Sequence, residues 1–188
     1  LYVGYRYFET IPGSAEKVVY PFGYGLSYTT FDVSVLKMSE CDDSICAQVQ
    51  VVNTGHTAGK EVVQLYSQAP GKILDGPARK LITYEKTRLL RPGELQIVTL
   101  SFAKNDLASY DDLGKIAKSA YILEQGTYAF YIGTSVRSAK KAAFTLEVGE
   151  HTVTLQLASH LAPTSLAKRM RSDGSFEELP MGECNDMN

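Results

Sequence analysis

Apolar side chains recur at every second residue from Phe31 onward, and no other feature of the sequence restricts its fold as strongly. Within residues 45–52, alanine and valine side chains share one face of an extended chain, while glutamines share the other. Successive side chains of a strand point to opposite faces, so this period of two predicts half-buried β-strands and not helices. Turn-forming residues, such as those at 53–55 and 91–94, separate the alternating runs.

We expect about seven or eight short strands and no amphipathic helix in the middle of the chain. The expected strands cover residues 31–36, 45–52, 62–66, 81–90, 95–102, 121–132, 143–148 and 153–157. Such a series predicts an all-β fold, namely an antiparallel β-sandwich of the immunoglobulin or fibronectin type III-like kind. Irregular N-terminal and C-terminal extensions complete the expected fold.

The two ends of the chain lack the alternation, so we divide the chain into three parts. Residues 1–30 are the expected linker or docking segment, residues 31–158 the sandwich, and residues 159–188 a C-terminal connector or tail. In the tail we expect a short helix over 163–170, with Thr164 as its N-cap, followed by a turn. The polar stretch 105–118 is expected to be a crossover loop between strands.

Residues 123–128 match a local signature of such sandwiches, the tyrosine corner. Tyr128 follows Gly126 by two positions at the start of a strongly apolar strand. In a tyrosine corner, the ring packs into the core and the hydroxyl bonds a backbone group a few residues upstream. We expect Leu123, Gly126 and Tyr128 to form this feature, and an ordinary core tyrosine is the alternative.

Composition excludes several classes of protein. The 188 residues include 19 basic and 21 acidic ones, and the net charge of −2 gives no electrostatic footprint for nucleic acid or for an anionic membrane. No apolar run approaches the roughly 18–20 residues of a membrane-spanning helix. The chain begins at Leu1, so we expect it to be a piece of a longer protein, whose leader cannot be read from this sequence.

The chain contains three cysteines, Cys41, Cys46 and Cys184, and an odd number argues against a complete disulfide framework. Cys41 and Cys46 could face each other across a short turn at 42–44, but we favour free thiols. The spacing of these cysteines is loose for zinc, and no histidine pair follows at ligand spacing. We therefore expect no metal site and no cofactor, and we assign the three scattered histidines, His56, His151 and His160, to the surface or to loops.

No catalytic residue emerges from the acidic pairs of the chain. Glycoside hydrolysis, for instance, uses two carboxyl groups that flank the scissile bond. The visible pairs, Asp42-Asp43, Asp111-Asp112 and Glu177-Glu178, lie in polar stretches, and neighbours on an extended chain point to opposite sides. We interpret all three pairs as solvated loop charges. No nucleophile elbow or dinucleotide-binding loop has its full set of glycines either.

The first thirty residues are rich in aromatic side chains but carry glycines and prolines that prevent a long regular element. So many aromatic rings need a surface to cover them. We expect this segment to dock on a neighbouring domain through Tyr5, Arg6, Tyr7, Phe22, Tyr24 and Tyr28. Sugar binding by stacking on such rings is the competing interpretation, although the chain contains no tryptophan.

The same segment carries a family resemblance. Residues 3–8 and 20–31 resemble a stretch of glycoside hydrolase family 3 enzymes, such as β-glucosidases, at the exit of their α/β-sandwich domain. Downstream motifs resemble the fibronectin type III-like domain that follows in that family. They lie at residues 52–55, 58–66, 89–93 and 106–111. The resemblance covers about residues 1–148, and the order and spacing of its motifs agree.

The resemblance implies that this chain is a non-catalytic accessory module. The parent would hydrolyse terminal β-glucosyl units with retention, with its nucleophilic aspartate in a (β/α)8 barrel and its acid/base residue upstream of Leu1. The implied partners are the catalytic domains of the same polypeptide, with β-glucosides as substrates of the parent; a stand-alone carbohydrate-binding module is the alternative. The extended tail is similar to a connector into a downstream domain, and the loop 71–80 is our candidate for approaching the parent's substrate.

Overall fold

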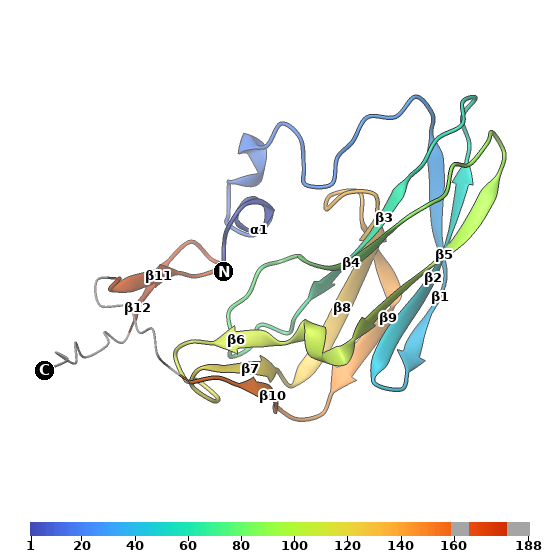
Figure 1. Ribbon diagram of the computed structural model, residues 1–188. Helices are drawn as coiled ribbons and strands as arrows, with labels where there is room; N and C mark the ends of the chain where they lie inside the picture. The colour runs from blue at the N-terminus through green and yellow to red at the C-terminus, as the bar shows by residue number, and fades with distance from the viewer. Residues whose placement is uncertain (159–165, 180–188) are drawn as a thin grey trace, which may run out of the picture.

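Two antiparallel sheets face each other in the computed structural model, which describes residues 1–158 and 166–179 (Figure 1). The three-stranded sheet has the order β1–β2–β5 and the four-stranded sheet the order β4–β3–β8–β9. The strands are β1 (Phe31–Cys41), β2 (Ser44–Asn53), β5 (Leu95–Ala103), β4 (Lys80–Lys86), β3 (Val62–Gln68), β8 (Gly126–Gly133) and β9 (Lys140–Val148). This arrangement confirms the predicted all-β sandwich.

One hydrophobic core fills the space between the two sheets. Its members include Ile45, Ala47, Val49 and Val51 of β2 and Val63, Leu65 and Phe130 of the opposite sheet. All seven are fully buried. Full burial of an aliphatic side chain contributes about 1.5–3 kcal/mol, so the alternation along the strands accounts for the pairing of the two layers.

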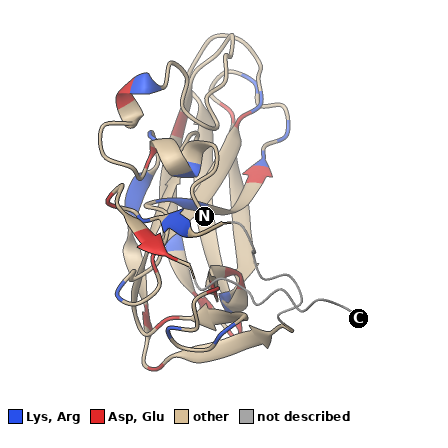
Figure 2. Cartoon of the chain, turned by 90° about the vertical axis from the view of Figure 1, so that its left-hand side faces the viewer, with Lys and Arg blue, Asp and Glu red and all other residues tan. Residues whose placement is uncertain are grey.

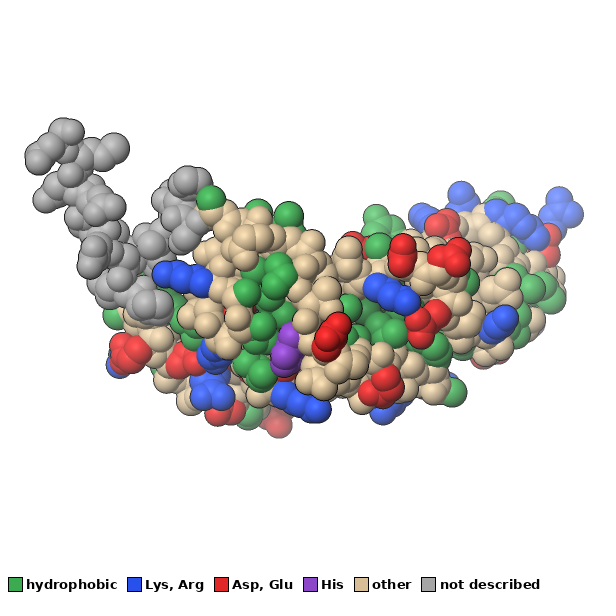
Figure 3. Space-filling model, turned by 90° about the horizontal axis from the view of Figure 1, so that it is seen from below, with side chains coloured by type: hydrophobic (Ala, Val, Ile, Leu, Met, Phe, Trp, Pro, Cys, Tyr) green, Lys and Arg blue, Asp and Glu red, His purple; other side chains and the backbone are tan. Residues whose placement is uncertain are grey.

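A third, smaller sheet lies below the sandwich in Figure 1 and has the order β10–β7–β6. It contains β6 (Ser109–Asp111), β7 (Ala120–Leu123) and β10 (Thr152–Gln156). The expected strand 121–132 is therefore divided into β7 and β8. Apolar side chains gather on the underside of the molecule (Figure 3), and the exposed ones of this sheet are Tyr110, Tyr121, Val153 and Leu155.

The expectation of a plain crossover loop over 105–118 is wrong in part, because a buried carboxylate organises that region. A 3-10 helix, η2 (Lys104–Leu107), and β6 occupy its first half. The carboxylate of Asp111 then accepts hydrogen bonds from the backbone N–H groups of Gly114, Lys115, Ile116 and Ala117. Asp111 is 1% exposed, so its predicted role as a solvated charge is also wrong.

The C-terminal residues form a β-hairpin and not the predicted helix. Residues 163–165 lie outside the described residues, but β11 (Lys168–Met170) pairs with β12 (Phe176–Glu178). An ion-pair network holds the hairpin, since Arg169 contacts both Asp112 and Glu177. Glu177 also pairs with Lys115, at 3.1 Å.

Only two short helices, α1 (Tyr5–Phe8) and η1 (Ala15–Lys17), precede the sandwich in the described part of the chain. No described helix is long and apolar enough to cross a membrane.

Tyr128 lies at the start of β8 with its ring in the core and 1% of its surface exposed. Its hydroxyl accepts a hydrogen bond of 2.8 Å from the backbone N–H of Glu124, four residues upstream. Burial raises the pKa of Tyr128 to about 12. Gly126 has a φ of +135°, and a Cβ there would meet Pro70 at 2.9 Å, so this turn requires glycine. Leu123 is packed in the core.

We expect Tyr128→Phe to lower the free energy of unfolding by about 1–3 kcal/mol, because the variant leaves the buried N–H of Glu124 without an acceptor. Urea unfolding followed by circular dichroism measures the change. Tyr84→Phe is the matched control, since 64% of Tyr84 is exposed. Equal stabilities of the two variants would contradict a structural role for the Tyr128 hydroxyl.

We expect Asp111→Asn to destabilise the protein at pH 7, by about 1–3 kcal/mol, and to do so less in acid. Burial alone would raise the pKa of Asp111, but its backbone hydrogen bonds outweigh burial and lower it. The carboxylate therefore stabilises the fold fully above the unfolded pKa of about 3.9, and this contribution is lost as the pH falls through the lower native pKa. Urea unfolding at a series of pH values tests this, with Asp43→Asn as the exposed control. A difference that stays constant down to pH 2 would contradict it.

Candidate docking surface

Strand β3 is buried on both faces, although it belongs to an antiparallel sheet with one face toward the core. Val63 and Leu65 point into the core. Gln64 and Tyr66 alternate with them and therefore point outward, yet they are only 6% and 0% exposed. The cover over this outer face is provided by residues 1–30, which we call the N-terminal segment.

Aromatic packing holds the N-terminal segment on β3. The ring of Tyr5 stacks on Phe22, with centroids 4.3 Å apart and an angle of 19° between the planes. The same ring meets Tyr66 edge to face at 6.2 Å. The hydroxyl of Tyr5 also accepts a 2.8 Å hydrogen bond from the N–H of Leu81 in β4. Such aromatic pairs contribute about 0.5–1.5 kcal/mol beyond the area that they bury.

A buried amide satisfies the polar groups under this cover. The side chain of Gln64 donates to the carbonyl oxygens of Thr134, at 2.7 Å, and Gly23, at 3.5 Å, and accepts from the hydroxyl of Tyr66. Gly23 has a φ of +83°, and a Cβ there would lie 2.3 Å from the amide of Gln64, so only glycine fits. The adjacent carbonyl of Phe22 accepts from the N–H of Val136 at 2.9 Å.

Further polar contacts fix the middle and the C-terminal end of the N-terminal segment. Arg137 pairs with Glu9 at 2.9 Å and donates to the carbonyl of Ala15. At the C-terminal end, Thr29 donates a 2.6 Å hydrogen bond to the side chain of Asn53. Asn53 is fully buried, and its amide nitrogen donates to two backbone carbonyls. The segment is therefore part of the same packed body as the sandwich.

The other side of the N-terminal segment leaves large apolar side chains uncovered. Tyr20 stacks on Tyr24, with ring centroids 5.1 Å apart. We call the exposed group the apolar ridge; its members are Val19 (82% exposed), Tyr20 (69%), Tyr24 (50%), Leu26 (91%) and Tyr28 (98%). Acidic and basic residues are interspersed over the face that carries the N-terminus (Figure 2), so charge of a single sign does not dominate there.

The six expected docking residues do not form one surface. Tyr5 and Phe22 pack on the chain's own sheet, whereas Tyr24 and Tyr28 belong to the apolar ridge. Arg6 is half-buried near Lys80, whose pKa is lowered by burial and then by the charge of Arg6. Tyr7 lines a separate hollow of about 420 Å³ between the N-terminal segment and the C-terminal hairpin.

Sequence reasoning missed Val19, Tyr20 and Leu26, although two of them are among the most exposed apolar side chains of the described residues. A signal was present, because all three lie in or next to the glycine- and proline-bearing run that we expected to need a cover. The run could not show which of its side chains turn toward the chain's own sandwich.

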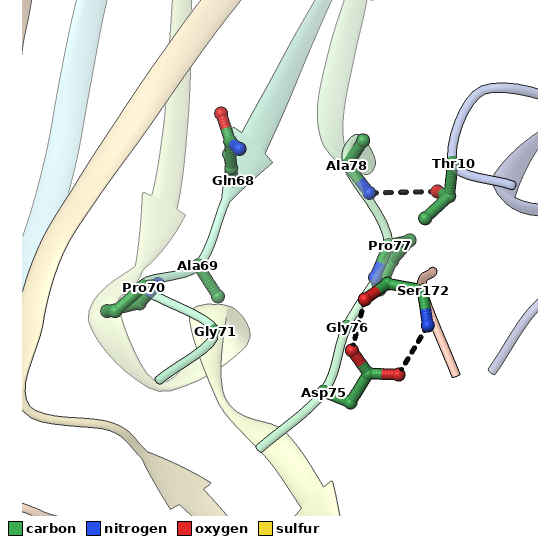
Figure 4. A pocket seen from close by; sticks show the side chains of 10 residues that line it. All are labelled: Thr10, Gln68, Ala69, Pro70, Gly71, Asp75, Gly76, Pro77, Ala78 and Ser172. Atoms are coloured by element: carbon green, nitrogen blue, oxygen red, sulfur yellow. Dashed lines mark hydrogen bonds between the residues drawn. The ribbon is translucent and has the colours of Figure 1, made fainter. Parts of the chain in front are cut away.

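The loop 71–80, our candidate for approaching the parent's substrate, is tied to the ends of the described chain (Figure 4). Asp75 accepts hydrogen bonds from the hydroxyl of Tyr2 at 2.6 Å and from the N–H and hydroxyl of Ser172 at 2.8 and 2.5 Å. Burial would raise the pKa of Asp75, but these donors outweigh it and lower the pKa. The adjoining hollow, of about 220 Å³, is lined mainly by small side chains and backbone.

The acidic side chains that we considered are committed to structural roles or lie in solvent. Asp111 binds backbone N–H groups, Asp112 and Glu177 bind Arg169, and Glu178 pairs with Lys168. Asp42 and Asp43 are exposed in the β1–β2 turn. Residues 1–158 and 166–179 contain no group of three or more histidine, cysteine or acidic side chains that could hold a metal ion.

The histidines lie where the sequence analysis expects them as far as the structure describes them. His56 is exposed. His151 is half-buried at the surface and accepts a hydrogen bond from the N–H of Gln125 through Nδ1. His160 lies outside the described residues.

Comparison with known proteins adds the family. The family described as the fibronectin type III-like domain matches residues 61–136 of this chain. The chain is 51% identical to β-glucosidase A of Butyrivibrio fibrisolvens and 43% identical to a β-glucosidase of Ruminococcus albus, and each alignment covers 99% of this chain. It spans only 24% and 20% of those two proteins.

The solved structures that resemble this chain are also β-glucosidases. A β-glucosidase from Paenibacillus barengoltzii superposes with a TM-score of 0.87 at 40% identity, over 96% of this chain and 21% of that one. β-Glucosidase 3B from Thermotoga neapolitana, solved in complex with α-D-glucose, gives 0.70 at 41% identity, over 80% and 20%. Residues 61–136 therefore match the fibronectin type III-like family, and nearly the whole chain matches the part of glycoside hydrolase family 3 β-glucosidases that contains this domain.

Proposed function

We propose that this chain is a non-catalytic accessory module that docks on and buttresses the catalytic domains of its own polypeptide through the apolar ridge. The ridge carries the proposal, because five large apolar side chains stand in water on a segment that is itself firmly packed. Exposed apolar patches of this kind mark interaction surfaces. In this division, residues 1–30 dock, residues 31–158 form the sandwich and residues 159–188 connect onward.

The parent, in this proposal, is a β-glucosidase that hydrolyses terminal β-glucosyl units with retention of configuration. The names of the relatives support the activity, and the small share of each relative that this chain spans leaves room for the catalytic domains. The reactive carboxyls belong to those domains, because the acidic side chains named above are bound by backbone or cationic partners or lie in an exposed turn.

In the whole β-glucosidase, we expect Leu26→Ser combined with Tyr28→Ser to lower the midpoint of thermal unfolding by several degrees. In the isolated chain the same pair of changes should leave the stability nearly unchanged, since both side chains are more than 90% exposed there. Leu36→Ser is the matched control, because Leu36 is 51% exposed on β1 and lies outside the ridge. Differential scanning calorimetry of both proteins measures the four changes.

Two results would contradict the docking proposal. One is an equal loss of stability from the ridge variant in both proteins. The other is saturable binding of cello-oligosaccharides by the isolated chain that disappears in the ridge variant, which would make the ridge a carbohydrate-binding site and the chain a stand-alone module. Release of nitrophenol from an aryl β-glucoside by the pure chain would likewise contradict a non-catalytic role.

A further inference from the structure

Two thiols lie on one face of the β1–β2 hairpin, near its turn. Cys41 pairs with Ser44, and Cys46 pairs with Ser39. Ser44 and Cys46 are two residues apart on β2 and therefore share a face, so Cys46 is the diagonal neighbour of Cys41 on that face. Both cysteines are free thiols in the structure; Cys41 is exposed and Cys46 is half-buried.

The surroundings of the two thiols are polar and accessible. The sulfur of Cys46 lies 3.6 Å from the hydroxyl of Ser101 on the neighbouring strand β5. The pKa of the Cys41 thiol is raised, mainly by the neighbouring Cys46 thiol. This effect is larger than the opposite effects of Ser39 and Lys37, which lower the pKa. The two thiols share one face of the hairpin as diagonal neighbours, and a small reagent in solution can reach the exposed thiol of Cys41.

We propose that Cys41 and Cys46 form a reversible dithiol–disulfide pair that exchanges with a small disulfide of the glutathione type. The Cys41 thiolate attacks one sulfur of the small disulfide, whose S–S bond breaks, and one small thiolate leaves and takes up a proton. The Cys46 thiolate then attacks the Cys41 sulfur and releases the second small thiol. The protein loses two protons and two electrons, and the small disulfide is reduced to two thiols.

The diagonal geometry makes this pair a switch and not a structural staple. Diagonal Cα atoms in an antiparallel pair lie about 7–8 Å apart, whereas a relaxed disulfide spans about 4.4–6.8 Å. Closure therefore requires the end of the hairpin to tighten, which is feasible beside a two-residue turn at Asp42 and Asp43. Strained, exposed disulfides have higher reduction potentials and are reduced readily, so the bond forms and breaks with the redox state of the surroundings.

The test uses the whole chain with Cys184→Ser, which leaves two thiols. The protein is equilibrated with reduced and oxidised glutathione, the remaining thiols are blocked with N-ethylmaleimide, and the intact mass is measured. We expect a species that lacks two hydrogen atoms and carries neither glutathione nor maleimide, and dithiothreitol should convert it back to the doubly blocked form. With Cys46→Ser added, the reaction should stop at a glutathione adduct on Cys41.

The matched control moves the second thiol two residues along β2, from position 46 to position 48, which keeps it on the same face. Cys46→Ser with Gln48→Cys keeps two thiols on β1 and β2, but Gln48 is paired with Lys37 and lies farther from Cys41. We expect glutathione adducts and no ring closure in this variant. Persistent glutathione adducts in the original pair, disulfide-linked dimers, or equal ring closure in the control would overturn the proposal. Circular dichroism confirms in each case that the variant is folded.

Discussion

The outer face of β3 must be covered, and this requirement links the N-terminal segment to the sandwich. A glutamine and a tyrosine, Gln64 and Tyr66, stand on that face among apolar neighbours and would lose their partners if the segment moved away. Buried polar groups without partners cost about 1–3 kcal/mol each. The stacked rings of Tyr5 and Phe22 close the same site from above, so packing and hydrogen bonding favour one position of the segment.

A segment held in this way can present its other side as a preformed surface. The apolar ridge needs no ordering when a partner arrives, because its backbone is already fixed by Glu9, Phe22 and Thr29. Cys41 is the last residue of β1, whereas Thr29 precedes the first residue of that strand, so the thiol pair and the ridge lie at opposite ends of β1. The C-terminal hairpin joins the same body through Ser172, which donates to Asp75, and through Arg169, which pairs with Asp112.

The sequence was most informative where a single local pattern decides the outcome. Alternating strands such as β2 have one apolar face, and this alternation predicted the two-layer sandwich. The spacing from Gly126 to Tyr128 predicted where a ring would enter the core. The role of Asp111 could not be predicted, because its donors come from a turn whose shape depends on the carboxylate itself. The hairpin of β11 and β12 is too short to show a period, and its stability depends on Asp112 and Lys115, far away in sequence.

We expect the N-terminal segment and the sandwich to behave as one body, and amide hydrogen exchange followed by mass spectrometry tests this claim most directly. The N–H groups of Leu81 and Val136, which bond to Tyr5 and Phe22, should exchange as slowly as those of β2. In Tyr66→Ala, both should exchange faster together with residues 1–25, while β2 stays protected. Fast exchange of Leu81 and Val136 in the unmodified chain, or no difference in the variant, would contradict the claim.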